Sequence, residues 1–263
     1  ASESFTSDLN PFLKSFSATS YSFFLCFNKA SISLDLATLS SGLIKTICLP
    51  ASTNSPFFEG QNTGMLSSRT FQFGLFPRTE IPSFLNSYKD YEEIINKYIE
   101  TKTISKPRQI WWKIRPHYDY KTIEFRVCDV QRSLQNTDMI ISLVQSLVRS
   151  IIVNNDYNHD YCYEYLTDGL WKASSKNFSC KIIDPYDSKL VTMEEMINRM
   201  IAYSKNSLEY FGNSHVINTV QNIIKNGTEA NNQIKVYDKH GFKKLKKYLM
   251  TSVDYEYKRR NYV

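Results

Sequence analysis

The sequence predicts an α+β fold, in which strand-like segments come early in the chain and helical segments come late. Apolar and polar residues alternate over residues 109–129, whereas apolar residues further along recur at helical spacing. The chain has 263 residues, of which 42% are hydrophobic and 22% charged, so it can bury a substantial core. No internal repeat is visible, and one large domain or two small ones would fit.

The first 49 residues form an atypical segment rich in Ser and Phe, which we separate from a larger domain over residues 50–263. The segment has no clear period beyond a possible alternation around Ile32, Leu34 and Leu36. The sequence SPFFEGQNTG in the following region is typical of a loop, because its Pro and Gly residues favour turns.

The first clear helix is predicted to begin at Ser87. Its hydroxyl can accept a hydrogen bond from a free amide of the opening turn. The negative charge of Asp90 interacts favourably with the positive N-terminal end of the helix dipole. The residues expected on the buried face are Tyr88, Tyr91, Ile94, Ile95, Tyr98 and Ile99.

Residues 109–129 are predicted to form a β-hairpin with one apolar and one charged face. The apolar face comprises Ile110, Trp112, Ile114, Ile123, Phe125 and Val127. The charged face carries Lys113, Arg115, Glu124 and Arg126. Two interpretations of that face stay open: a solvent-exposed ladder of ion pairs, or a functional surface.

Later segments are predicted to be helical. A wide apolar stripe runs from Ile140 to Ile152, with Thr137 as the expected cap. Further helices are expected over residues 160–173, from the capping box Thr192 to Glu195 onward, from Ser214 to Gly227, and over Phe242–Met250. The tryptophans Trp111, Trp112 and Trp171 are expected in the core.

Composition argues against several classes of protein. The net charge of +6 is concentrated near the C-terminus, where an exposed helix face explains it without a nucleic-acid partner. Five scattered cysteines without a C-x-x-C motif fit neither a disulfide framework nor a zinc site, so we expect a cytoplasmic protein. The apolar run Met139–Val153 is too short and polar to span a bilayer, so no membrane partner is expected.

Several motifs, taken together and in order, resemble the YbdK-type carboxylate-amine ligases and type 2 glutamate-cysteine ligases over residues of about 50–250. They are STNSPFFEGQNTG, SSRT, IWWKIRP, TIEFRVCD, GLWKASSKNF, KIIDP and NGTEANNQ. The resemblance implies a glutamine synthetase-like antiparallel sheet backed by helices, lacking part of its N-terminal strands. It also implies an ATP- and Mg²⁺-dependent reaction that joins glutamate or a similar acid to an amine through an acyl phosphate.

The resemblance also suggests roles for individual residues. Glu124 is the candidate magnesium ligand, because Mg²⁺ prefers carboxylate oxygens. Arg126 and Arg115 are the candidate catalytic residues, because guanidinium groups can stabilise a transferred phosphoryl group. The candidates for binding ATP or substrate are Arg69, Asn54, Ser55 and Lys172.

Simpler roles stay open for these residues: Arg69 as a solvent-facing loop residue, and Asn54 and Ser55 as turn formers. His117 is expected at the surface. The expected partners are small-molecule substrates, and a homo-oligomer is possible. The alternative function is a truncated or catalytically inactive ligase-like domain that acts as a binding or partner protein.

Overall fold

A computed structural model describes most of the chain beyond the first fifty residues. The described residues are 23–26, 52–120, 122–154, 162–176, 178–185 and 187–251, with only the backbone described for 23–26 and 251. The alternation expected around Ile32, Leu34 and Leu36 lies outside them, as does most of the atypical segment 1–49.

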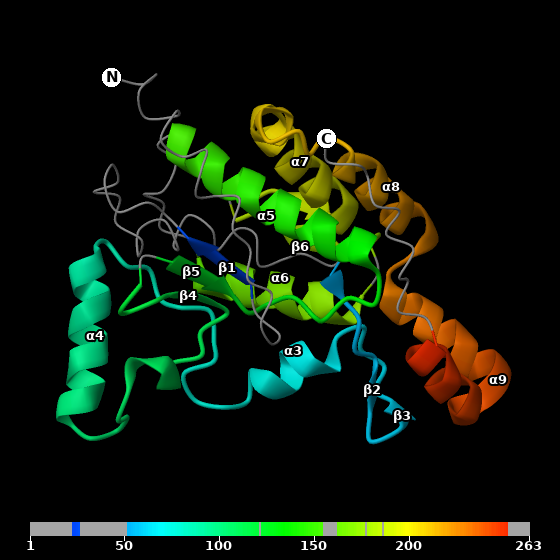
Figure 1. Cartoon of the computed structure of the whole chain (residues 1–263), viewed down its shortest axis with the longest axis horizontal. Helices are drawn as coiled ribbons and strands as arrows, with labels where there is room; N and C mark the ends of the chain where they lie inside the picture. The colour runs from blue at the N-terminus through cyan, green and yellow to red at the C-terminus, as the bar shows by residue number, and fades with distance from the viewer. Residues whose placement is uncertain are drawn as a thin grey trace, which may run out of the picture.

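A small antiparallel sheet lies at the centre of the fold (Figure 1). Its strands are β1 (Phe23–Cys26), β5 (Thr122–Phe125) and β4 (Ile114–Pro116), in the order β1-β5-β4. The predicted hairpin is therefore confirmed, although its strands are shorter than expected. Strand β1 is an element that the sequence analysis missed, because its four apolar residues FFLC show no alternation.

Both faces of the hairpin are buried. Ile114, Ile123 and Phe125 pack into the main core, as the alternation predicted. On the other face, Arg115 and Glu124 are Cα partners across the two strands and are only 7% and 2% exposed. The interpretation of this face as a solvent-exposed ladder of ion pairs is therefore wrong.

Helices supply most of the main core. Helix α5 (Leu134–Asn154) packs against α7 (Met193–Tyr210) and α8 (Val216–Asn226), beside the sheet (Figure 1). Among the described helices, α5 alone is long and apolar enough to cross a membrane by length and composition, because it extends beyond the run Met139–Val153 that was expected to be too short and polar. Most of α5 is buried inside the fold. The expected cap Thr137 is wrong, because the helix begins three residues earlier and the Thr137 hydroxyl donates to the Ser133 carbonyl.

Helix α4 (Tyr88–Glu100) lies at one end of the molecule (Figure 1). Its predicted start at Ser87 is confirmed. Ser87 and Asp90 form a reciprocal capping box, and Tyr91 and Ile95 are buried. These side chains belong to a second, smaller apolar cluster that holds α4 against the segment before β4.

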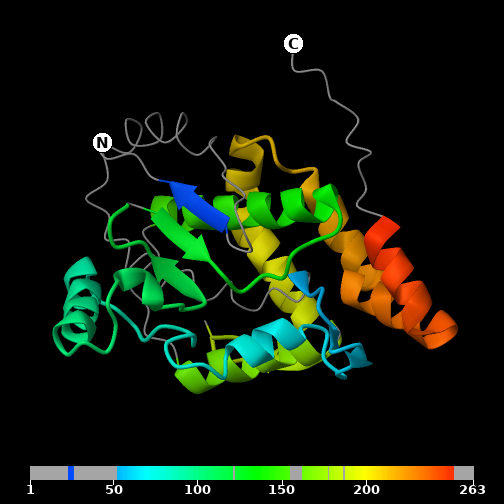
Figure 2. The same cartoon turned by 60° about the horizontal axis from the view of Figure 1, so that its bottom comes forward.

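On the side of the sheet away from α5, α3 and α6 lie next to each other (Figure 2). The remaining elements are α3 (Ser68–Phe73), α6 (Tyr163–Ser175), α9 (Glu229–Thr251), the 3₁₀ helix η3 (Pro107–Gln109), and the strands β2 (Phe57–Phe58), β3 (Gln61–Asn62), β6 (Lys181–Ile183) and β7 (Leu190–Thr192). The capping box of Thr192 and Glu195 is confirmed at the start of α7, and Gly227 ends α8 as predicted.

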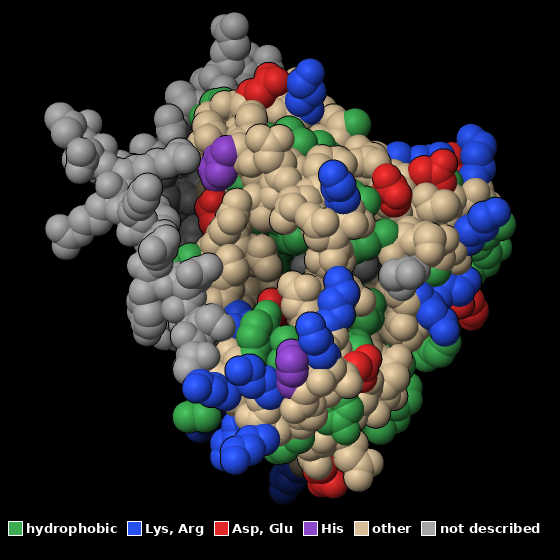
Figure 3. Space-filling model, turned by 90° about the vertical axis from the view of Figure 1, so that its right-hand side faces the viewer, with side chains coloured by type: hydrophobic (Ala, Val, Ile, Leu, Met, Phe, Trp, Pro, Cys, Tyr) green, Lys and Arg blue, Asp and Glu red, His purple; other side chains and the backbone are tan. Residues whose placement is uncertain are grey.

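Two expectations need correction. Trp171 is 46% exposed and does not belong to the core. Helix α9 begins at Glu229, well before the predicted Phe242, and Gly241 interrupts it with φ 72° and ψ 178°. After this kink, α9 exposes the lysines Lys243, Lys244, Lys246 and Lys247, on the face of the molecule shown in Figure 3.

Candidate active site

The centre of the candidate site is the carboxylate of Glu124, which lies between two guanidinium groups. Arg115 contacts one carboxylate oxygen, and Arg126 donates to the other at 2.6 Å. The side chains of Glu124, Arg115 and Arg126 are 3%, 9% and 17% exposed. Both oxygens of the candidate magnesium ligand are therefore engaged by arginine, and Arg126 is the more accessible of the two cations.

Arg69 extends this group from helix α3. Its guanidinium donates to the backbone carbonyls of Arg126 at 3.1 Å and Cys128 at 3.3 Å. The same group lies 3.7 Å from a carboxylate oxygen of Asp129. Arg69 is thus a partly buried residue that joins α3 to the end of β5, and not the solvent-facing loop residue of the simpler interpretation.

Lys113 is a buried cation beside these arginines. Its ammonium donates to the Thr70 carbonyl at 3.2 Å and lies 5.4 Å from the centroid of the Phe73 ring, which Arg69 and Arg126 also approach. Lys113 is 3% exposed. Burial, and then the positive charges of Arg69 and Arg126, lower the pKa of Lys113 from 10.5 to about 8.

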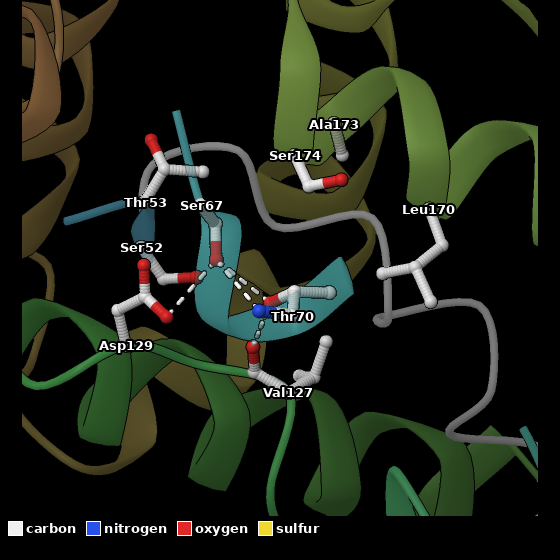
Figure 4. Close-up of a pocket in the computed structure, with 9 residues that line it drawn as sticks. All are labelled: Ser52, Thr53, Ser67, Thr70, Val127, Asp129, Leu170, Ala173 and Ser174. Carbon is white, nitrogen blue, oxygen red and sulfur yellow. Dashed lines mark hydrogen bonds between the residues drawn. The ribbon is translucent and has the colours of Figure 1, made fainter. Parts of the chain in front are cut away.

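Asp129 connects the arginine group to the loop before α3. It accepts hydrogen bonds from the Asn54 backbone N–H at 2.7 Å, the Ser55 hydroxyl at 2.8 Å and the Ser67 hydroxyl at 3.0 Å. Burial raises its pKa, although these hydrogen bonds act in the opposite direction. Figure 4 shows the Ser67 hydroxyl directed at this carboxylate, beside a cavity of about 10 Å³ that has room for about one water molecule.

Asn54 and Ser55 are held by other parts of the chain. The side-chain amide nitrogen of Asn54 donates to the Val130 carbonyl, and the side-chain oxygen of Asn54 accepts from Gln233 in α9. Ser55 donates to Asp129 and accepts from the Arg69 backbone amide at 3.2 Å. Their contacts are therefore more than local turn formation, and they fix the loop against β5 and α9.

Lys172 lies outside this connected group. It forms an ion pair of 2.7 Å with Asp168, one turn earlier on α6, and the two side chains are 29% and 44% exposed. The other six predicted site residues are linked through Asp129 and Arg69. His117 is half-buried in the turn between β4 and β5, where burial and nearby Arg115 lower its pKa.

The described residues fit an anionic ligand better than a magnesium ion. Four cations, Arg69, Lys113, Arg115 and Arg126, accompany three acids, Glu124, Asp129 and the exposed Glu80 near Lys113. No group of three or more His, Cys, Asp or Glu residues in the described part of the chain could hold a metal ion. The role of Glu124 as a metal ligand therefore stays a prediction.

Asp129, Ser67 and Lys113 were not among the site residues predicted from the sequence. Asp129 ends the motif TIEFRVCD, and Ser67 begins SSRT, so both were within reach of the motif argument. What the sequence could not indicate is that backbone amides of Leu66 and Ser67 donate to the Ser174 carbonyl in α6, which brings GLWKASSKNF to the same place.

Comparison with known proteins gives a consistent result. The sequence model of "Glutamate-cysteine ligase family 2 (GCS2)" matches residues 45–249. A protein of Solibacter usitatus named "Putative glutamate--cysteine ligase 2" is 30% identical over 211 residues, which cover 79% of this chain and 55% of that protein. Proteins with the same name from Herpetosiphon aurantiacus and Gloeobacter violaceus are 29% and 31% identical, with 73% and 72% of this chain and 51% and 52% of each relative covered. The chain spans about half the length of these curated relatives.

Proposed function

The chain belongs to glutamate-cysteine ligase family 2, and from this premise we propose that it is an ATP-dependent carboxylate-amine ligase, or the part of one that spans these residues. The proposed reaction joins glutamate or a similar acid to an amine such as cysteine through an acyl phosphate. The single observation that supports this proposal most is the linked group of Arg115, Arg126, Arg69 and Asp129, where three of the family-like motifs meet.

In this proposal the arginines bind and orient anions. Arg126 is suited to reach a ligand, because it is the less buried of the two arginines that contact Glu124. Arg115 contacts the other oxygen of the same carboxylate and is more deeply buried. Fixed guanidinium groups stabilise negative charge without reorganising at the moment of reaction. The Arg69 guanidinium would hold Arg126 in place by donating to the Arg126 backbone carbonyl, and it would add a further positive charge.

ATP would supply the phosphoryl group that activates the acid, and the excess of cations over acids fits its phosphates. Lys172 remains a proposed phosphate-binding residue, although it lies outside the linked group. The described residues do not fit a magnesium site, so the proposal assigns no step to the metal. A glutamine synthetase-like arrangement of the sheet, a cytoplasmic location and a homo-oligomer are parts of the same proposal.

A coupled assay tests the activity. Purified protein is given ATP, Mg²⁺, glutamate and a panel of amines that includes cysteine, and the release of ADP and phosphate is measured. We expect release that depends on both the acid and the amine, and Arg126→Lys should reduce it at least tenfold, because an ammonium cannot form the planar contacts of a guanidinium. Absence of amine-dependent turnover from folded protein would reject catalysis by this chain.

A second candidate function is a ligase-like domain without catalysis, which acts as a binding or partner protein. The observation that favours it is that both Glu124 oxygens contact arginines, so this carboxylate serves as a counter-ion in the described structure. Calorimetric titration with ATP separates the two functions. Weak binding that is independent of Mg²⁺ would support the second, whereas tight, Mg²⁺-dependent binding would support the first.

A further inference from the structure

A second cavity of about 250 Å³ lies between α3, α6 and the segment that contains Lys113. Its buried lining includes Thr70, Ile81, Lys113 and Ser174, which are between 3% and 6% exposed. Lys113 is the one charged side chain among these buried lining residues. Glu80 also lines the cavity, but it is exposed. The cavity thus combines a charged inner end with an apolar surround.

The ammonium of Lys113 has unused capacity for an anion. It carries three N–H groups, and its one hydrogen-bond acceptor in the described structure is the Thr70 carbonyl. No carboxylate of the described residues forms an ion pair with it, and the positive charges of Arg69 and Arg126 act on it more strongly than the negative charges of Glu80 and Asp129. A buried cation without a close counter-ion is costly, and binding an anion would offset that cost.

Large apolar side chains border the same cavity and are exposed to solvent. Phe71, Leu75, Tyr163 and Trp171 line it and are 49%, 71%, 41% and 46% exposed. Exposed apolar side chains gathered at one cavity are typical of a binding site. Trp171 and Tyr163 come from α6 and Phe71 from α3, so the apolar border is assembled from two helices.

We propose that this cavity binds a small organic carboxylate with an apolar body. The carboxylate would accept hydrogen bonds from the Lys113 ammonium, and the body would pack against Trp171 and Phe71. The volume is below the range of most drug-sized sites, which limits the ligand to a small molecule. The inference concerns a ligand site next to the arginine group and does not depend on ligase activity.

Isothermal titration calorimetry with four probes tests this site on the full chain. The probes are phenylacetate, phenylacetamide, acetate and inorganic phosphate. Phenylacetate should bind at least about tenfold more tightly than phenylacetamide, because a hydrogen bond to a charged group favours the anion. Acetate should bind more weakly than phenylacetate because it lacks the ring.

Two variants and a matched control assign the binding to the cavity. Lys113→Met should remove the preference for phenylacetate over phenylacetamide. Trp171→Ala should weaken both ligands and keep their ratio. Lys89→Met is the control, because Lys89 is an exposed lysine of α4 whose side chain is 81% exposed. Thermal unfolding of each variant shows that it is folded.

Several results would overturn the proposal. These are equal binding of phenylacetate and phenylacetamide to the unmodified protein, no binding of either at millimolar concentration, or a preference that persists in Lys113→Met. Inorganic phosphate that binds more tightly than phenylacetate and displaces it would show that the site takes phosphate, and the carboxylate assignment would then be wrong.

Discussion

At the scale of single residues, Glu124 has a structural role that precedes any catalytic one. Its carboxylate is the counter-ion of both Arg115 and Arg126, so its removal would take this negative charge away from two buried or partly buried cations. Glu124→Ala should therefore lower the free energy of unfolding by about 3–5 kcal/mol, the range for breaking a buried ion pair. Urea unfolding followed by circular dichroism measures this change.

An exposed ion pair provides the control for Glu124. Lys97 and Glu100 are 3.0 Å apart on α4, but their side chains are 70% and 69% exposed. Glu100→Ala should change the free energy of unfolding by less than about 1 kcal/mol, because water and salt screen such pairs. Equal effects of the two substitutions would mean that the Glu124 carboxylate is not buried as described. Loss of activity in Glu124→Ala therefore needs a folding measurement before it is assigned to metal binding.

Lys113 should reduce the stability of the protein in a manner that depends on pH. Its pKa is about 8 in the folded protein, against 10.5 for an ordinary lysine, so the unfolded chain binds more protons between these values. The stability of the unmodified protein should rise as pH increases from about 8 to 10.5. Below pH 8 Lys113 is charged in both the folded and the unfolded chain. The shift of its pKa from 10.5 to about 8 then corresponds to a loss of roughly 3 kcal/mol in the free energy of unfolding.

Lys113→Met tests this linkage. The variant should be more stable than the unmodified protein at pH 7, and the difference should shrink as pH rises through 8 toward 10.5, because the neutral lysine no longer carries the penalty. Chemical unfolding at pH 7, 8, 9 and 10 measures the difference without added anions. A difference that does not change with pH would show that Lys113 titrates normally.

At the scale of elements, sequence patterns predicted the helices that have local signals. Ser87 and Asp90 close a capping box at α4, and Thr192 and Glu195 do so at α7, because both motifs act within four residues. The start of α5 had no comparable signal, and Thr137 was the wrong cap. Capping boxes depend on local contacts, whereas α5 is stabilised mainly by packing on α7 and α8.

The hairpin and its charged face illustrate what alternation can and cannot predict. The pattern correctly placed Ile114, Ile123 and Phe125 together in the core. It could not show whether Arg115 and Glu124 face water, because their burial depends on Arg126 and on segments far away in the sequence. Of the seven site residues selected from the sequence, six are linked in the structure, whereas Lys113 was not among those selected.

Gly241 offers a test of one element. Its φ of 72° and ψ of 178° lie in a region that residues with a side chain rarely adopt, and the basic part of α9 follows it. Gly241→Ala should lower the free energy of unfolding by about 1–3 kcal/mol or straighten α9. Circular dichroism and thermal unfolding distinguish these results, and Lys239→Ala two residues earlier is the control. If both variants match the unmodified protein in stability and helix content, the kink is absent in solution.

At the scale of the whole molecule, Asp129 joins segments that are far apart in the sequence. Through Asn54, Ser55 and Ser67 it fixes the loop before α3, and Asn54 in turn accepts from Gln233 in α9. None of these partners belongs to the α5–α7 core. The described fold therefore has an apolar core of helices on one side and a polar junction of loops on the other.

This division predicts that loss of Asp129 loosens one region and spares the other. In Asp129→Ala the backbone N–H of Asn54 and the hydroxyls of Ser55 and Ser67 lose a buried acceptor. The free energy of unfolding should fall by more than about 2 kcal/mol, because the lost partner is a charged group. Amide hydrogen exchange, followed by mass spectrometry, should speed up in residues 52–70 and 228–233 while α5 and α7 keep their protection. Asp168→Ala is the matched control, because Asp168 is a partly exposed acid of α6 that pairs only with Lys172 among the described residues. A uniform increase over all segments would instead mean that the junction and the helical core unfold as one cooperative unit.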